Sequence, residues 1–149
     1  MRVSTRFSDA VHIIAFINIY HGKIPLTSDN IAGSIGTSPV VVRRIMSQLN
    51  KACILNTKKG TKTPKIARKL SEISLFDIYL AVEGSQQHLF TVDTKTNPAC
   101  IVGGNIQQVL GQVYDEAEKA AYNKLNQTTM QDVVDDILLR QRIKEQGMR

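Results

Sequence analysis

Residues 26–54 constrain the fold of this chain more than any other segment, because they hold two sets of helix-end signals around a glycine. Thr27 is placed to cap a first short helix, and Gly36 is suited to end it, since glycine readily adopts the left-handed conformation found at helix ends. Ser38 is placed to cap a second helix, and Pro39 fits its first turn, where a missing N–H costs nothing. The segment therefore predicts two helices joined by a tight turn.

The second predicted helix, residues 38–53, has one apolar face. Its members recur at offsets of 0, 3, 4, 7 and 11, the spacing of a buried helical stripe: Val42, Ile45, Met46, Leu49 and Cys53. With the small Ala32 and the turn residue Gly36, this stripe fits a helix-turn-helix unit, which needs a close helix approach and a locked second helix. An ordinary helical hairpin inside a core is the alternative that the spacing leaves open.

The opposite face of this helix offers side chains suited to DNA. Arg43 and Arg44 are the candidates for contact with guanine bases. Because adjacent residues are about 100° apart on a helix, one of the two should face the groove and the other should bind phosphate. Ser38 and the helix N-terminus can bind phosphate through backbone N–H groups. Val40 and Val41 are candidates for contact with thymine methyl groups.

A basic loop follows the second helix. Polar alternation around residues 58–65 predicts two short strands, and a hairpin in this place would be a wing. Its lysines are candidates for the DNA backbone or the minor groove: Lys58, Lys59 and Lys62. A flexible charged loop is the alternative, since Pro64 weakens strand pairing.

Helical patterns on either side complete the expected architecture, which is mainly α with a small β wing. Residues 1–84 are predicted to form a winged helix-turn-helix DNA-binding domain, closed by a helix that Ser74 caps and Gly84 ends. Residues 85–104 are predicted to be a linker or effector loop, with a short strand at 88–92. Residues 105–149 should contain a long helix and a C-terminal helix capped by Thr128 or Thr129.

The long helix carries a broad apolar stripe: Ile106, Val109, Leu110, Val113, Ala117, Ala120, Ala121 and Leu125. Such a stripe can pack within one chain or across two subunits. Its place after a linker and before a polar tail favours a dimerisation helix, and hence a homodimer.

Charge divides the chain sharply. Residues 1–70 hold 12 Lys and Arg against two acids, a net charge of +10, whereas residues 71–149 hold 7 against 11, a net charge of −4. A basic half joined to an acidic half indicates that one part meets a polyanion such as double-stranded DNA. No run of about 18 apolar residues and no secretory signal is present in the sequence, so we expect a cytoplasmic protein without a membrane partner.

Catalysis and metal binding have little support. The histidines His12, His21 and His88 have no spacing that suggests a metal site, and no catalytic residue is predicted. Cys53 is expected to be a small core residue. Cys100 precedes a predicted helix start, where the helix dipole could lower the pKa of the thiol, so it is a candidate redox or effector residue, with an inert loop anchor as the alternative.

Several segments resemble the Rrf2 family of bacterial winged-helix regulators, the group that includes IscR, NsrR and CymR. These are MRVSTRFSDAVHI, the stretch from LTSDNIAG to LNKACIL, ISLFDIYLAVEG, and NPAC followed by a long helix; SPVVVRR and CIVGGNIQ look most like the cysteine-poor YwnA-like branch. The resemblance implies a homodimer paired through the helix from about Asn105, a near-palindromic operator and repression of transcription. Cluster-binding members carry three cysteines where residues 86–106 hold only Cys100, so no iron–sulfur cluster or other cofactor is predicted. Lys59 and Gly60 match the family's wing motif only loosely.

The sequence therefore predicts a sequence-specific DNA-binding transcriptional regulator with an unknown effector. The alternative from another class is a protein-interaction module that holds an enzyme or a second regulator through the long helix and binds DNA without specificity. A thiol-dependent enzyme built on Cys100 is a third and weaker option.

Overall fold

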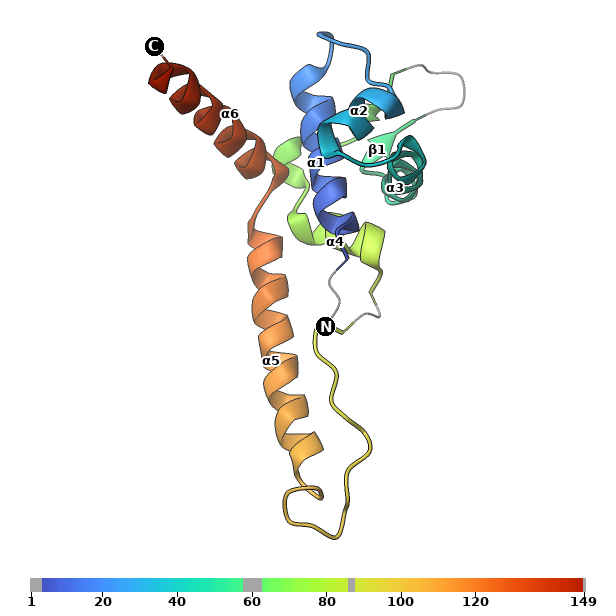
Figure 1. The fold of residues 1–149 in the computed structure, drawn as a ribbon, viewed down its shortest axis with the longest axis vertical. Helices are drawn as coiled ribbons and strands as arrows, with labels where there is room; N and C mark the ends of the chain where they lie inside the picture. The colour runs from blue at the N-terminus through green and yellow to red at the C-terminus, as the bar shows by residue number, and fades with distance from the viewer. Residues whose placement is uncertain (1–3, 58–62, 86–87, 149) are drawn as a thin grey trace.

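The computed structural model describes residues 4–57, 63–85 and 88–148. Its elements within these residues are α1 (Arg6–Tyr20), α2 (Ser28–Ile35), α3 (Pro39–Lys51), β1 (Leu55–Asn56), β2 (Lys65–Ile66), the 3₁₀ helix η1 (Leu70–Glu72), α4 (Leu75–Glu83), α5 (Ile106–Gln127) and α6 (Met130–Gly147). Helices α1 to α4 and the strands form a body, from which α5 projects as a long arm (Figure 1). Residues 88–104 run beside α5, and α6 starts where α5 meets the body and points away from it to the upper left in Figure 1. The predicted fold class, mainly α with a small β sheet, is confirmed.

The helix-end signals of the central segment act as the sequence predicts. The hydroxyl of Thr27 accepts a hydrogen bond from the Asn30 backbone N–H at 3.1 Å, and the hydroxyl of Ser38 accepts one from the Val41 N–H at 3.4 Å. Gly36 ends α2 with a φ of 83°, a left-handed conformation that is unfavourable for residues with a Cβ. These residues fix the turn between α2 and α3.

The body has one hydrophobic core, to which every helix except α5 contributes. The fully buried large side chains include Ile13, Ile14 and Ile17 from α1, Ile31 from α2, Val42, Ile45 and Leu49 from α3, and Ile78 from α4. The periodic faces that the sequence shows for α1, α2 and α3 are therefore the faces that pack together. This packing locks α3 in place and leaves its other face free.

The predicted wing strands are present. Leu55 pairs with Ile66 and Asn56 with Lys65 in an antiparallel sheet of two strands. Pro64 lies just before β2, so its missing N–H does not interrupt the ladder. The loop lysines Lys58, Lys59 and Lys62 lie outside the described residues.

The prediction that Cys53 is a core residue is wrong, because α3 ends at Lys51 and the chain then turns sharply. Cys53 takes a φ of 58° and is exposed, while the next residue, Ile54, is fully buried. The Ile54 backbone N–H donates to the Leu49 carbonyl at 3.0 Å, which closes the turn. The helical offset of 11 therefore does not apply beyond Leu49, and Ile54 fills the core instead.

The start of α6 belongs to the same core as residues of the predicted 1–84 unit. Met130 is fully buried, and its backbone N–H donates to the Ile73 carbonyl at 2.8 Å. One residue earlier, Thr129 forms a reciprocal capping box with Asp132 and a β-bridge with Ser74. The C-terminal helix is thus anchored to the body at its first turn.

This anchoring predicts a large difference between two methionines. Met130→Ala should lower the free energy of unfolding by about 2–5 kcal/mol, because it removes a fully buried side chain and leaves a cavity. Met148→Ala is the matched control, since the Met148 side chain is 87% exposed. Urea denaturation of both variants measures the effect, and an equal stability of the two would contradict the shared core.

The apolar stripe predicted along α5 is divided between two environments. Val109 and Val113 are 57% and 52% exposed, and Ala117 and Ala120 are also exposed. Leu110, Ala121 and Leu125 are half-buried, and the side of α5 that carries buried Glu118 faces α4 and residues 88–92. The short strand predicted at 88–92 is wrong, because these residues have an irregular or bent backbone without ladder pairing. No helix in the described ranges is long and apolar enough to cross a bilayer.

Candidate nucleic-acid interface

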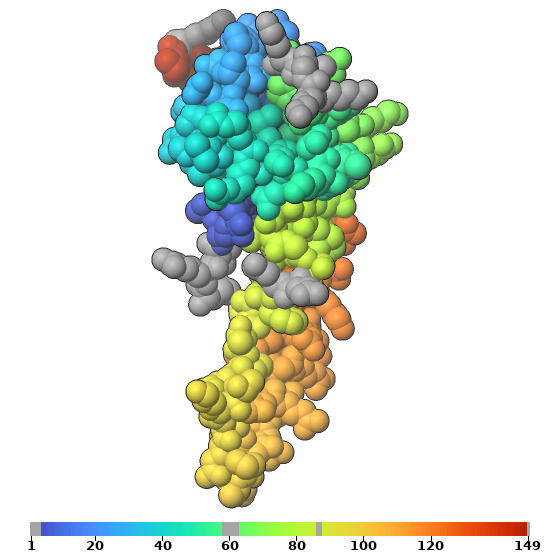
Figure 2. Space-filling model, turned by 90° about the vertical axis from the view of Figure 1, so that its right-hand side faces the viewer, coloured from blue at the N-terminus to red at the C-terminus, as the bar shows by residue number. Residues whose placement is uncertain are grey.

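The free face of α3 brings together most of the side chains predicted to contact DNA. Ser38, Val40, Arg43 and Arg44 are all exposed, and the Val40 side chain is 55% accessible. Figure 2 shows α2 and α3 on the face turned to the viewer, clear of α5 and of the chain beside it, which lie below the body. This surface is therefore open to a large partner.

Val41 differs from the other candidates. Its side chain is half-buried and packs against the core, because Val41 lies one helical turn before the fully buried Ile45 and flanks the stripe. Val41 is therefore half-buried at the edge of the free surface, and its contact with DNA stays a prediction. Val40 is the better placed of the two valines for an apolar contact.

The two arginines are free to bind an anion. Among the described residues, neither guanidinium makes a hydrogen bond or an ion pair. The N-terminus of α3 adds positive potential through the helix dipole, although the Val41 and Val42 N–H groups are already bonded to Ser38 and Pro39 has no N–H. Two unpaired cations beside a helix N-terminus form a surface that attracts phosphate.

Asn50 is a positioning residue that the sequence did not reveal. Its side-chain oxygen accepts a hydrogen bond from the Thr57 backbone N–H at 3.1 Å, which ties the last turn of α3 to the chain just after β1. Lys65, on β2, is exposed at the base of the wing. No spacing pattern indicates the Asn50 contact, because it depends on the turn at Cys53.

Comparisons with known proteins bear directly on this geometry. A family model described as Rrf2, iron-dependent transcriptional regulator, matches residues 3–136. The chain belongs to the Rrf2 family. Its members are transcriptional regulators, and the chain is a DNA-binding regulator of this family.

Individual relatives agree with the family. YwnA of Bacillus subtilis (strain 168), by name an HTH-type transcriptional regulator, is 34% identical over 135 residues, which cover 91% of this chain and 98% of YwnA. A crystal structure of a protein described as DNA-binding is 34% identical, with a TM-score of 0.68 over 86% of this chain and 97% of that one. The fold is also similar to that of IscR from T. potens, which is 20% identical, with a TM-score of 0.66 over 92% of this chain and 88% of that one.

The family description mentions iron, so the donor groups of this Rrf2 chain bear on the question. Cys100 is exposed and is the only cysteine between residues 86 and 106. In the part of the chain that the structure describes, no three His, Cys, Asp or Glu side chains gather where they could share a metal ion. One thiol without companions does not fit an iron–sulfur cluster, whose irons need several thiolate or imidazole ligands.

Two backbone groups of the same loop lie close to the exposed Cys100 thiol. Hydrogen bonds from the backbone of Gly103 and then Val102 lower the pKa of this thiol, with burial opposing them only weakly. Gly103 must be a glycine, because a Cβ there would collide with the Asn97 carbonyl. The helix α5 begins only at Ile106, so the tight loop, and not the helix dipole proposed from sequence, gives the lowered pKa.

This lowered pKa predicts an unusually reactive thiol. In a Cys53→Ser chain, alkylation of Cys100 by iodoacetamide should reach half its maximal rate at a pH below that of free cysteine, about 8.5, because the thiolate is the reacting species. The same chain unfolded in urea is the control and should return to the ordinary value. Identical pH profiles for the folded and unfolded chains would contradict the role of the loop.

Proposed function

We propose that this Rrf2 regulator is a homodimeric, sequence-specific repressor that binds a near-palindromic operator in the cytoplasm. It acts by binding and not by catalysis. The observation that carries the proposal is the division of α3 into a face locked in the core and a face that presents Arg43 and Arg44 without partners among the described residues. A rigid helix of this kind can enter the major groove and hold its side chains in a fixed register.

The exposed stripe on α5 supports the homodimer. From Val109 to Ala120 the stripe spans about 16 Å, at 1.5 Å per residue. Two valines that are more than half exposed on an otherwise regular helix indicate a surface suited to a second helix of the same kind. Two copies of α3 related by a two-fold axis would then meet two inverted half-sites.

The charge distribution supports DNA as the partner of the body. Residues 1–70 carry a net charge of +10, and these residues include α3 and both wing strands. A net positive body attracts phosphate over the distance of a Debye length, about 8 Å at physiological salt. Binding should therefore weaken steeply as salt rises.

We further propose that this regulator works without an iron–sulfur cluster. The donor set near Cys100 supports this proposal, since one exposed thiol leaves most ligand positions of such a cluster unfilled. Operator binding by protein purified with and without a strong iron chelator provides the test. Equal affinity in both samples is expected, and loss of affinity after chelation would contradict the proposal.

The repressor proposal is tested on the regulator's own promoter. Labelled promoter fragments are titrated with the protein in the presence of excess unrelated duplex, and transcription from the same fragment is measured with purified polymerase. We expect saturable binding to the promoter that persists in the presence of unrelated duplex. The amount of transcript should fall as the protein occupies the promoter. Equal affinity for all duplexes would overturn sequence specificity, and an unchanged or increased transcript would overturn repression.

A further inference from the structure

A pocket of about 200 Å³ lies between residues 88–92 and the α5 arm. It is outside the α3 surface and has no part in the proposed DNA contact. Its walls come from two segments that are distant in sequence and lie side by side in Figures 1 and 2. A pocket of this size has room for a small organic molecule.

Two carboxylates line the pocket. Glu118 is only 7% exposed; its Oε2 lies 3.3 Å from His88 Nδ1, and its Oε1 accepts a hydrogen bond from the Tyr122 hydroxyl at 3.2 Å. Each carboxylate oxygen can accept a second hydrogen bond, so Glu118 keeps acceptor capacity. Asp115, three residues earlier on α5, is exposed and has no hydrogen-bond or ion-pair partner within the described ranges.

The remaining wall of the pocket is open and mainly apolar, with Thr91 as its one hydroxyl-bearing aliphatic residue among those described. The rings of Phe90 and Tyr114 pack with centroids 5.3 Å apart and planes inclined by 33°. Gly111 lines the pocket on α5, and a Cβ added there would have no atom within 4 Å. The space above Gly111 is therefore free for a ligand that contacts the aromatic pair.

We infer that this pocket binds a small organic cation, an amine or guanidinium compound with an apolar portion, whose binding changes the affinity of the regulator for DNA. Among the described lining residues there is no Lys or Arg, and His88, which can become a cation, already has its Nδ1 3.3 Å from the Glu118 carboxylate. An anion would therefore meet two carboxylates and one imidazole that is already paired. A cation would meet the unpaired Asp115 and the free acceptor positions of Glu118, while its apolar part packs on the aromatic pair. The regulatory half of this inference rests on the proposed function.

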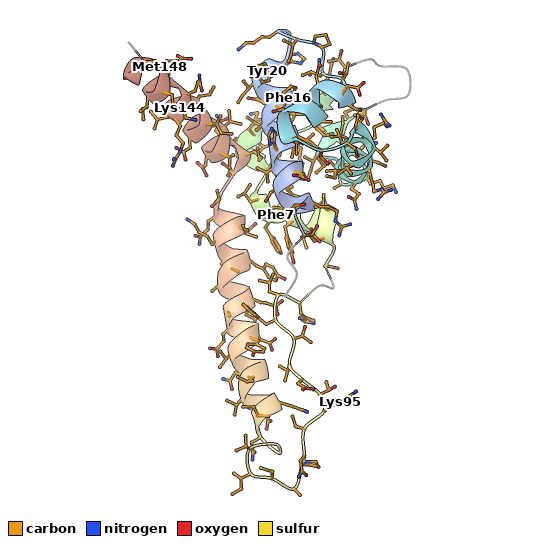
Figure 3. The ribbon with its side chains drawn as sticks, in the orientation of Figure 1. Phe7, Phe16, Tyr20, Lys95, Lys144 and Met148 are labelled. Carbon is orange, nitrogen blue, oxygen red and sulfur yellow. The ribbon has the colours of Figure 1, made fainter. Side chains whose placement is uncertain are left out.

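A chain of side-chain contacts connects Glu118, which lines the pocket, to the body that carries α3. Tyr122 donates to Glu118 and packs against Phe76 and Tyr79 of α4, with ring centroids 5.1 Å and 5.5 Å apart. Tyr79 in turn packs edge-on against Phe7 of α1 at 5.6 Å. Figure 3 shows Phe7 at the end of the body from which α5 extends. Because α4 also packs on α3, a ligand that shifts Glu118 acts on the support of the DNA-reading helix.

Calorimetric titration of the full chain tests the binding. The probes are benzylamine and n-butylguanidinium, with benzyl alcohol and phenylacetate as neutral and anionic compounds of similar shape. We expect saturable binding of the cations alone, weakened about tenfold by Asp115→Asn, which removes a charge-assisted contact. Gly111→Leu should abolish binding by filling the pocket, whereas Glu145→Gln, at an exposed position of α6, should bind as the wild type does.

Gly111→Ala controls for the possibility that Gly111→Leu loses binding because the chain does not fold. Gly111→Ala places only a methyl group in the open space and should retain binding. Alanine and leucine both have a higher helix propensity than glycine, so neither substitution should destabilise α5. The inference is wrong if neither cation binds, or if Gly111→Leu binds them as well as Gly111→Ala does.

Promoter titrations with and without the bound cation separate the two proposals. A changed affinity for the promoter, lost in Gly111→Leu, supports regulation through the pocket. Binding of the cation without any change in promoter affinity overturns the regulatory half. A ligand-free protein without preference for its promoter overturns the proposed function and leaves the binding of cations to the pocket intact.

Discussion

Replacing Arg43 and Arg44 together by alanine is expected to weaken operator binding by at least about tenfold, and by more than a hundredfold if the lost base contact is a good bidentate one. A bidentate contact to guanine contributes about 1–3 kcal/mol of discrimination, and each lost phosphate contact reduces the salt dependence by about one unit of slope. Both side chains are exposed, so the free energy of unfolding should stay within about 0.5 kcal/mol of the wild type. Fluorescence anisotropy at several salt concentrations measures the effect.

The single variants distinguish the roles of the two arginines. The variant of the base-reading arginine should relax sequence preference at one base pair, whereas the other should weaken binding to all sequences equally. Arg140→Ala with Arg142→Ala is the matched control, since it removes the same charge from α6, away from α3. If the Arg43 and Arg44 double variant bound the operator like this control, the assignment of α3 as the reading helix would be wrong.

Placing glutamate at Val109 and Val113 is expected to convert a dimer into monomers and to lower operator affinity by about a hundredfold or more. In a two-fold dimer, the two substitutions bring four negative charges into an apolar seam, and each separated monomer can then reach only one half-site. The fold of the monomer should survive, because both valines are more than half exposed and glutamate is a good helix former. Sedimentation velocity and operator titration measure the two effects.

The control for this experiment is a double variant with two glutamates on a different side of α5. Gln108→Glu and Asn126→Glu add two carboxylates to exposed positions, with Gln108 about 100° around the helix from Val109. This variant should remain dimeric. If the valine variant kept the same mass in solution and the same operator affinity as this control, the stripe on α5 would not be the dimer interface.

The local structure of the central segment could be predicted from sequence because its signals are local. Thr27, Gly36 and Ser38 act on backbone groups within a few residues, so their roles follow from residue type and spacing alone. At Cys53, by contrast, a left-handed turn moves the core position to Ile54, which residue type and spacing do not indicate. Periodicity assumes that a helix continues, and it carries no information on where the turn occurs.

Long-range packing could not be predicted in the same way. The burial of Met130 depends on the return of the chain to α1 and η1 after the whole length of α5, which no local pattern encodes. The half-burial of Val41 depends on the angle at which α3 meets the core, and the Glu118 pocket depends on where residues 88–92 lie. The lysines of the wing stay a prediction from sequence, since they lie outside the described residues.

Selection of bound duplexes from a random pool tests the central claim, that paired α3 helices read base sequence, most directly. We expect enrichment of an inverted repeat, with half-sites about 10 base pairs apart from centre to centre, or a multiple of that spacing, as two-fold related helices in successive major grooves require. The Arg43→Ala and Arg44→Ala protein should not enrich this repeat. A pool that stays random after selection with the wild type, or an enriched single half-site without a partner, would show that paired α3 helices do not read base sequence.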